Sequence, residues 1–446
     1  MLALKIIFCI ILFILYVAMM GFMIILERDK PKNMIIWSVV FLCTQIIGYI
    51  IFIASRYVFY KKKQSLTIKQ KEDEIYNKLI SKNVYDNKAN TNNEVFNFTK
   101  LAFNANITVN NSYEFFDTYE NIKENLIKDI TNAKHTIIFE ITKINTKDFQ
   151  DVKNLLIEKA KANVDVRFVY DRSISYKFIK ELKEAGVRAY RFSKLNTVGR
   201  VYSNLRNIIV IDGKIAYFAN LDFTKNQLSG NKEISASCLK VKGDVVQDVN
   251  ILAHKDTIFA SGKYIEYKKA YSNELKNSTT LQFVTNQADN DLELVLIKAI
   301  CMAKSSIQLQ LAQFIPTESI MSLLRFAINS NIDVRLMVPL KNDRRGKYFA
   351  SRAYAKELAL FGANVYLYDG YIKFNSITID NEYVITGSYV VDREHLNTSL
   401  QNMLLIKDNK AVTNYNKIFE ECVQNSYRIS NAKYMLLMEK FFKNFV

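Results

Sequence analysis

The chain has 446 residues and a formal net charge of +17, and 49% of its residues are hydrophobic. At about 150 residues per domain, this length leaves room for two or three domains. The apolar content excludes a wholly disordered protein, and a count of only 12 Gly and 3 Pro excludes the collagen-like and low-complexity classes. The five cysteines show no Cys-x-x-Cys spacing, which argues against a disulfide framework or a zinc site and indicates a reducing compartment.

The first sixty residues predict a membrane anchor. Residues 6–26 and 34–55 are uncharged apolar runs, each long enough to cross a hydrocarbon core of about 30 Å. A cleaved signal peptide is the alternative for the first run, but that run is too long and lacks a small-residue cleavage site. The short loop at residues 27–33 makes the two runs a hairpin. The larger Lys/Arg cluster follows the second run, at Arg56 and residues 61–63, and predicts a multi-pass protein of the cell membrane whose body faces the cytoplasm.

The positive charge of the body has two interpretations. A basic body that is tethered to the cytoplasmic leaflet is attracted to anionic lipid by about 1 kcal/mol per Lys or Arg near the surface. Nucleic-acid binding is the competing interpretation, but the sequence shows no recognition motif for it. We therefore predict anionic phospholipid as the partner, and no nucleic acid.

Beyond the hairpin, the residue patterns predict an α/β body. Residues 61–111 are polar and are interpreted as a helical stalk and linker. Helical and strand patterns then alternate, which predicts mostly parallel, buried sheets. Helices are expected at residues 119–133, 152–162 and 176–185, and strands at residues 136–141, 164–170 and 208–211.

The second half of the body repeats the first. The matching segments are residues 133–134 with 303–304, 163–168 with 331–336, 180–186 with 356–362, and 207–212 with 375–380. Four matches in the same order predict two homologous lobes. The expected organisation is a transmembrane hairpin (1–60), a stalk (61–111), and two α/β lobes (112–275 and 276–446). A pseudo-twofold arrangement of the lobes would bring equivalent strand ends together, where a ligand site is expected.

Several segments of the chain match the pattern of a known family. They are Trp37 and Gly48 in the second apolar run, residues 164–171, 314–316, 333–339, 354–362 and 368–370 in the lobes, and then Asp380 and Gly387-Ser388. Together with the hairpin and the duplicated body, they make the chain resemble the bacterial cardiolipin synthases of the phospholipase D superfamily. The resemblance covers nearly the whole chain and implies two phospholipase D-like α/β lobes.

The resemblance also implies a specific chemistry. In that family each lobe supplies a His-x-Lys-x-x-x-x-Asp motif. One histidine attacks the phosphorus and the other protonates the leaving alkoxide, while the lysines and a following asparagine hold the phosphate oxygens. Covalent catalysis, acid catalysis and oxyanion stabilisation each need their own residue type.

The motif positions of this chain have changed. In lobe one the motif aligns on Asp212, which puts Leu205 at the histidine position and Asn207 at the lysine position. In lobe two it aligns on Asp380, which puts Lys373 and Asn375 at the same two positions. Both histidines and both lysines of the family are therefore absent, as expected of a relative that has lost its catalysis.

The remaining candidate groups are few. The chain has three histidines, His135, His254 and His395, and the resemblance places only His395 in a loop that lines the site. One histidine cannot be both nucleophile and opposing acid. Lys373 is either a fixed positive charge for a phosphate or a solvated lysine. The candidates for phosphate or lipid binding are Lys373, Asn375, Asn207, His395 and Ser388, whereas Asp212 and Asp380 are interpreted as turn-forming residues.

Two further segments have weaker signals. Residues 341–347 form a basic loop that is either solvated or in contact with a membrane surface. Residues 435–446 are a short amphipathic end, which is expected to pack on lobe two rather than to bind a membrane.

Three functional hypotheses follow, none of which uses a cofactor or a metal. The first is a membrane-anchored, catalytically inactive relative of cardiolipin synthase. It would bind anionic phospholipid or regulate an active paralogue or another membrane enzyme, as a homo-oligomer or a hetero-complex. The second is an active phosphatidyltransferase that acts on phosphatidylglycerol, with a site rebuilt around Lys373 and His395. The third is a scaffold whose site is vestigial and whose surface recruits a partner.

Overall fold

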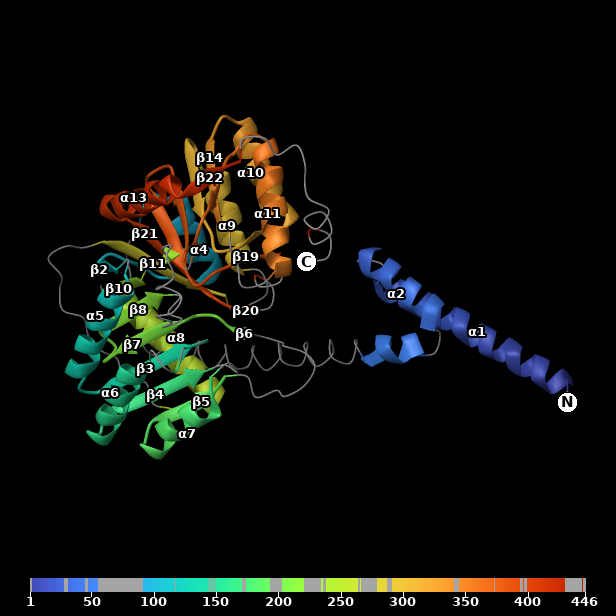
Figure 1. The fold of residues 1–446 in the computed structure, drawn as a ribbon, viewed down its shortest axis with the longest axis horizontal. Helices are drawn as coiled ribbons and strands as arrows, with labels where there is room; N and C mark the ends of the chain where they lie inside the picture. Colours follow the sequence, from blue (N-terminus) through green and yellow to red (C-terminus); the bar gives the residue numbers. More distant parts are fainter. Residues whose placement is uncertain are drawn as a thin grey trace. The chain divides into compact units, whose positions relative to one another are not determined.

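The computed structural model describes residues 2–27, 31–44, 47–54, 91–116, 118–142, 144, 146, 149–170, 174–192, 203–219, 234–235, 238–263, 265, 279–286, 291–340, 345–372, 374–393, 396, 399–429 and 443. The chain divides into two compact units. The first comprises Met1–Ile75 with Asn196–Val201, and the second comprises Tyr76–Leu195 with Tyr202–Val446. Figure 1 shows both units and labels many of their helices and strands.

The first unit is helical and packs around a small aromatic cluster. It contains α1 (Leu2–Glu27), α2 (Pro31–Thr44) and a further helical stretch at residues 47–54. Met23, Phe41 and Phe52 are buried together, while many other apolar side chains of these helices are exposed. A Cβ atom on Gly48 would lie only 2.5 Å from the Thr44 hydroxyl, so a larger residue here would force the Thr44 side chain to shift.

The transmembrane part of the predicted hairpin is not confirmed. Among the residues that the structure describes, no helix combines the length and the apolar character needed to cross a membrane. The assignment of residues 6–26 and 34–55 as membrane spans therefore stays a prediction.

The second unit contains both lobes. Lobe one is built on a seven-stranded sheet. Its strands are β2 (Asn111–Phe116), β3 (Thr136–Ile141), β4 (Asp165–Tyr170), β5 (Arg188–Arg191), β7 (Ile208–Ile211), β8 (Ile215–Ala219) and β10 (Cys238–Gly243). They are arranged in the order β2-β10-β8-β7-β3-β4-β5. The helices of this lobe are α5 (Tyr119–Asn132), α6 (Gln150–Lys161), α7 (Tyr176–Glu184) and α8 (Val245–Ser261). The first three pack on one face of the sheet, and α8 packs on the other.

Lobe two has the same arrangement. Its main strands are β11 (Thr280–Thr285), β12 (Ser306–Gln310), β14 (Asp333–Pro339), β15 (Asn364–Tyr368), β17 (Asn375–Ile379), β18 (Tyr383–Gly387) and β21 (Asn402–Lys407). They follow the order β11-β21-β18-β17-β12-β14-β15, with β1 (Ile107–Thr108) and β22 (Ser426–Arg428) added at the edges. The helices are α4 (Glu94–Phe103), α9 (Asp291–Met302), α10 (Glu318–Asn329), α11 (Arg345–Leu360) and α13 (Asn409–Gln424).

Strand by strand, the second sheet repeats the first, as the internal matches predict. Even the turns agree, because Asn163 and Asn331 precede β4 and β14 with left-handed φ angles of 63° and 61°. The prediction of mostly parallel sheets, however, is wrong. Only β3-β4-β5 and β12-β14-β15 run parallel, and the other neighbours in these two series of strands are antiparallel. The tight turns after β7 and β17 make β8 and β18 antiparallel to the strands that they follow, so these halves of the sheets contain no parallel crossover.

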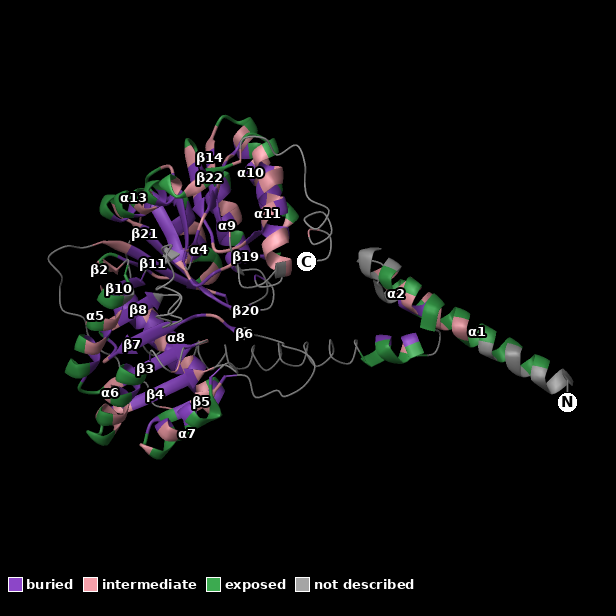
Figure 2. Ribbon diagram, in the orientation of Figure 1, coloured by how far each residue is buried: buried purple, intermediate pink, exposed green. Residues whose placement is uncertain are grey.

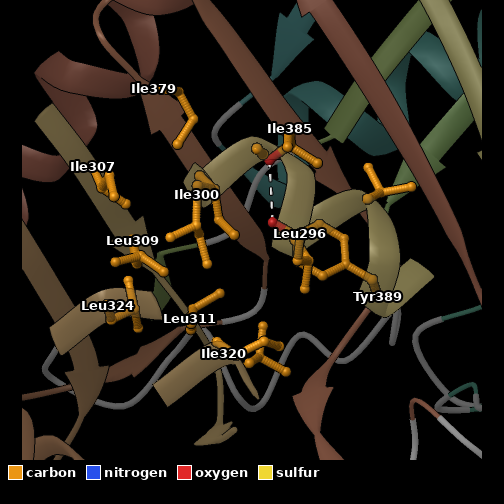
Figure 3. Close-up of a cluster of buried hydrophobic side chains, with 14 of the residues drawn as sticks. Leu296, Ile300, Ile307, Leu309, Leu311, Ile320, Leu324, Ile379, Ile385 and Tyr389 are labelled. Atoms are coloured by element: carbon orange, nitrogen blue, oxygen red, sulfur yellow. Dashed lines mark hydrogen bonds between the residues drawn. The ribbon is translucent and has the colours of Figure 1, made fainter. Parts of the chain in front are cut away.

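The cores follow from this layering (Figure 2). In lobe two, one face of the sheet packs against α9 and α10 through a continuous apolar cluster, in which the Tyr389 hydroxyl donates to the Ile385 carbonyl (Figure 3). A second cluster joins the lobes, because residues of α8 and α13 share it with strands of both sheets. The lobes therefore share one apolar interface.

The segment expected to be a stalk contributes to lobe two. Residues 55–90 lie outside the described residues, but α4 packs on α9, and β1 pairs with β11. The N-cap of α4 is Asn93, whose side chain accepts hydrogen bonds from Val95 and Phe96 N–H. The described residues 91–108 are therefore ordered on the second lobe, and the exact domain boundaries stay predictions.

Candidate functional site

The two motif aspartates have the same structural role in the two lobes. Asp212 has a left-handed φ of 52°, and its carboxylate accepts hydrogen bonds from the backbone N–H groups of Lys134, His135 and Thr136 at 2.7–2.9 Å. Asp380 has a φ of 51° and accepts from the N–H groups of residues 304–306 at 2.7–2.9 Å. Each carboxylate therefore ties the turn after one strand to the start of the next strand in the sheet.

The electrostatics of Asp380 agree with this role. Partial burial opposes ionisation, but the backbone N–H donors and the Ser305 hydroxyl outweigh it and hold the pKa of the Asp380 carboxyl below its ordinary value. A carboxylate that accepts several hydrogen bonds from its own backbone is a fixed acceptor and has no proton to donate at neutral pH.

The two asparagines at the lysine positions are also equivalent to one another. Asn207 Oδ1 accepts from the Thr142 N–H at 2.9 Å, just beyond β3. Asn375 Oδ1 accepts from the Ala312 N–H at 2.8 Å, just beyond β12, and its amide group donates to the Tyr389 carbonyl. Both side chains are buried. At the positions whose lysines hold phosphate in the family, Asn207 and Asn375 instead hold the ends of two central strands.

Leu205 and Ser388 lie at the junction of the lobes. The short strands β6 (Ser203–Asn204) and β20 (Ser399–Leu400) pair across the lobes, and the Leu205 N–H donates to the Leu400 carbonyl at 2.8 Å. The Ser388 hydroxyl accepts from the Asn402 N–H at 3.0 Å, and the Ser388 N–H donates to Asn402 Oδ1 at 3.2 Å.

The preceding glycine is required by the same contact. Gly387 has a φ of 140°, and a Cβ atom there would lie 2.6 Å from the Asn402 carbonyl oxygen. No side chain other than that of glycine fits this approach of two backbones.

Two predicted site residues, Lys373 and His395, lie outside the described residues, as do the loop residues 341–344. The ladder next to Lys373 is described: β16 (Tyr371–Ile372) pairs with β9 (Ile234–Ser235) of lobe one. It is the counterpart of the β6–β20 pairing, so each motif begins at a contact with the opposite lobe. His254, the other histidine of interest, is buried on α8, where removal from water lowers its pKa to about 4.

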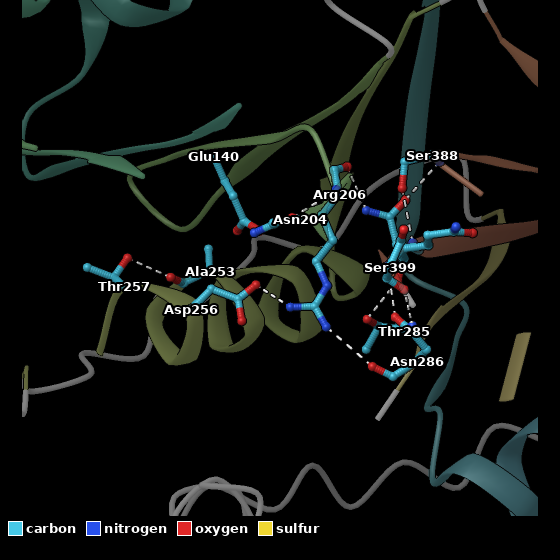
Figure 4. A network of polar contacts seen from close by, with 12 residues as sticks. Glu140, Asn204, Arg206, Ala253, Asp256, Thr257, Thr285, Asn286, Ser388 and Ser399 are labelled. Carbon is cyan, nitrogen blue, oxygen red and sulfur yellow. Dashed lines mark hydrogen bonds and ion pairs between the residues drawn. The ribbon is translucent and has the colours of Figure 1, made fainter. Parts of the chain in front are cut away.

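The most distinctive polar feature of the junction is a buried ion pair that we did not predict (Figure 4). Arg206, which stands between the two motif positions of lobe one, forms an ion pair with Asp256 of α8 through its guanidinium. Their side chains are only 2% and 4% exposed. The guanidinium also donates to the Asn286 carbonyl at 3.3 Å, and the Arg206 carbonyl accepts from the Asn402 amide at 2.9 Å. Arg206 therefore connects lobe one to two segments of lobe two.

A third buried charge-bearing group completes this network. Glu140, near the end of β3, accepts a hydrogen bond from the Asn204 side chain. Burial and the neighbouring Asp256 carboxylate raise the pKa of Glu140 well above its ordinary value, and the positive charge of Arg206 only partly opposes them. Folding therefore favours the protonated form of Glu140, and Asp256 is the ion-pair partner of Arg206.

A sequence signal for part of this network exists. Glu140 interrupts an otherwise apolar strand, and a carboxyl in such a place needs a partner or a proton. The partner itself could not be identified, because Asp256 is 50 residues away from Arg206 and meets it only through the packing of α8.

These contacts limit what the described part of the site can do chemically. Asparagine, serine and leucine at these positions supply neither an activated nucleophile nor a general acid. The described Asn207, Asn375, Ser388 and both motif aspartates are bonded to the protein's own chain. Across the described ranges, no group of three or more His, Cys, Asp or Glu side chains could hold a metal ion.

Comparison with known proteins agrees with this architecture. Residues 296–423 match the family model described as "Cardiolipin synthase, PLD-like domain". The chain is 26% identical to the major cardiolipin synthase ClsA of Bacillus subtilis, over 95% of this chain and 94% of that protein. It is 27% identical to a cardiolipin synthase of Oceanobacillus iheyensis, over 95% and 93% of the two chains.

The resemblance to bacterial cardiolipin synthases of the phospholipase D superfamily is confirmed. A crystal structure of a phosphatidylserine synthase from Haemophilus influenzae is similar in fold, with a TM-score of 0.59 and 12% identity over 79% of this chain and 97% of that one. The phospholipase D-like α/β fold is thereby confirmed as well. Cardiolipin synthase-like sequence and altered motif positions therefore occur in the same chain.

Proposed function

We propose that this protein is a membrane-anchored, catalytically inactive relative of the cardiolipin synthases that binds anionic phospholipid and regulates a partner in lipid or envelope synthesis. The observation that supports it most is the state of the lysine positions. Asn207 and Asn375 are buried and bonded to backbone groups at the ends of β3 and β12. An asparagine that is hydrogen-bonded to the backbone at the end of a strand cannot also stabilise the negative charge that develops on a phosphorane intermediate.

The buried junction supports the same conclusion. Arg206 is paired with Asp256, so its guanidinium is not an unpaired cation that waits for a phosphate. A transferase of this superfamily would need its lobes to present a nucleophile and an acid to one phosphorus atom. Here the lobe-one histidine position is occupied by leucine, whose backbone is bonded to lobe two.

Membrane anchoring is supported by the first unit. Its helices expose large apolar side chains along their length, among them Ile7, Phe13 and Ile25 of α1 and Ile47 and Ile50 of the following helical stretch. An apolar surface of this extent is unusual in a soluble protein and marks a protein or membrane contact. The net charge of +17 favours an anionic lipid surface.

A second function has one observation in its favour. The relatives with similar sequences are named cardiolipin synthases, which favours an active phosphatidyltransferase. In that case Lys373 and His395 are the groups that would have to replace the family histidines. Alanine substitution of Lys373 or His395 would then abolish turnover. A protein that only binds lipid has no turnover for either substitution to abolish.

The binding half of the proposal is tested with vesicles. The full chain in detergent is reconstituted or mixed with vesicles of phosphatidylglycerol, and with vesicles of phosphatidylcholine as the control. We expect saturable binding to the anionic vesicles that weakens as salt is raised, because the attraction is electrostatic. Equal binding to both vesicle types, or none to either, would contradict the proposed lipid preference.

A further inference from the structure

The outer ends of α10 and α11 expose an apolar patch on lobe two. Phe326, Leu360 and Phe361 are 69%, 58% and 43% exposed. The ends of the two helices meet here, because the Arg325 guanidinium stacks 4.6 Å from the Phe361 ring centroid and a Cβ atom on Gly362 would lie 3.4 Å from Ile328. Phe326 follows Arg325 directly in α10, and Leu360 precedes Phe361 at the end of α11. Three large apolar side chains at one exposed corner indicate contact with another surface, whereas single exposed apolar side chains do not.

The internal repeat shows that the fold itself does not require this patch. Helices α6 and α10 have the same length and the same distance to the following strand, which makes Glu158 the counterpart of Phe326. The left-handed glycines Gly186 and Gly362 align the ends of α7 and α11, which makes Glu184 and Ala185 the counterparts of Leu360 and Phe361. Lobe one is thus polar or small where lobe two is apolar.

One residue of the C-terminal segment lies beside the patch. Lys443 forms an ion pair with Glu357 of α11, and its Nζ atom lies 5.1 Å from the Tyr354 ring centroid. Glu357 also pairs with Arg325, the residue that stacks on Phe361. The contacts therefore lead from Lys443 through Glu357 and Arg325 directly to the apolar patch.

The chemistry of the segment complements this corner. Residues 435–446 read MLLMEKFFKNFV, so phenylalanines precede and follow Lys443. The last residue of the described body is Ile429, which is bonded to β15 at the sheet edge next to α11. The 14 residues from there to Lys443 can span up to roughly 45 Å, which is more than enough to reach the ends of α10 and α11.

We infer that residues 435–446 are the occupant of the patch formed by Phe326, Leu360 and Phe361, held there by the Lys443–Glu357 ion pair. The segment covers an apolar corner that would otherwise contact a membrane or a second copy of the chain. This inference depends on the described contacts of α10 and α11 and is independent of whether the protein is an enzyme.

The test is hydrogen exchange of the full-length protein in detergent, read out in peptides from residues 430–446 and from α10 and α11. We expect Phe326→Glu, which introduces the lobe-one residue type, to speed exchange in the C-terminal peptides about fivefold, because the apolar contact between the segment and this ring is lost. Lys443→Glu should speed it about twofold to fivefold, the range of a partly exposed ion pair. Lys443→Arg, which keeps the positive charge opposite Glu357, should leave exchange near the wild-type rate.

The matched controls use the other lobe. Glu158→Gln and Glu181→Lys alter the equivalent corner of lobe one and should leave exchange of the C-terminal peptides unchanged. Unchanged exchange in peptides of α5 and α8 shows that each variant is folded. The inference is overturned if Phe326→Glu and Lys443→Glu exchange like the wild type, if protection appears only with vesicles present, or if it depends on protein concentration.

Discussion

The two lobes share a sheet topology but differ in what they bury at equivalent positions. Counted along the matched strands, Glu140 and Arg206 of lobe one correspond to Gln310 and Phe374 of lobe two. Lobe one buries a carboxyl group and the guanidinium of the Arg206–Asp256 ion pair there, whereas lobe two buries an amide and a ring that packs on Tyr415. The residues that define the frame, Asp212 with Asp380 and Asn207 with Asn375, keep the same hydrogen bonds in both lobes. The frame has therefore been maintained while the contents of the site have diverged.

The largest effect is expected from breaking the buried pair of lobe one. Arg206→Met leaves Asp256 buried without its cation and should lower the free energy of unfolding by about 3–5 kcal/mol. The double variant Arg206→Met/Asp256→Leu should recover most of this loss, because no unpaired charge remains. Phe374→Leu at the matching position of lobe two should cost only about 1 kcal/mol. Denaturant unfolding measures all three, and a double variant as unstable as the single one would contradict the ion-pair account.

The next effect tests whether the frame is symmetric. Asp212→Ala and Asp380→Ala each remove the acceptor for three backbone N–H groups and should each cost about 1–3 kcal/mol. Since the pKa of Asp380 is lowered by folding, its contribution is present above the ordinary carboxyl pKa and is lost as the pH falls below about 4. Thermal unfolding at pH 7 and pH 3 checks both points. A loss in only one lobe would show that the aspartates are not equivalent.

The internal repeat could be predicted from the sequence, whereas the antiparallel strands and the buried ion pair could not. The repeat was visible because residues that set special backbone conformations, such as Asn163 and Asn331, recur in identical contexts. The antiparallel half of each sheet was missed because the turn at Asp212-Gly213 was assigned no returning strand, so that β8, β10 and β18 were left out of the prediction. The Arg206–Asp256 pair was missed because it depends on where α8 packs, which no local pattern determines.

A smaller, pH-dependent effect distinguishes α8 from α13. Burial raises the pKa of Asp248 to about 7, although the hydrogen bond from Asn106 opposes this. Val412 is the counterpart of Asp248 in α13, because each residue follows the N-cap of its helix by the same number of residues. A carboxyl whose pKa is raised by folding destabilises the protein progressively as the pH rises from about 4 to about 7. Between pH 4 and pH 8, the stability of Asp248→Asn should therefore rise steadily relative to that of the wild type, which denaturant unfolding across this range measures. Parallel pH profiles for the two proteins would contradict the shift.

The smallest effects are expected at exposed charges. Lys180–Glu184 in lobe one and Lys417–Glu421 in lobe two are exposed pairs one helical turn apart. Lys180→Ala and Lys417→Ala should each change the free energy of unfolding by less than about 0.5 kcal/mol, because solvent screens both charges. A larger loss in lobe one would mean that its charges matter at the surface as well as in the buried network.

The most direct test of the central claim is turnover of phosphatidylglycerol. The purified full-length protein, free of host synthase, is incubated with phosphatidylglycerol in mixed micelles beside an active cardiolipin synthase, and cardiolipin and glycerol are measured. A Leu205→Asp/Lys373→Ala double variant serves as the control for any activity of the site. We predict no product above background from the wild type, while the active relative turns over. Product from the wild type that disappears in the double variant would contradict the account and show that the site has been rebuilt for catalysis.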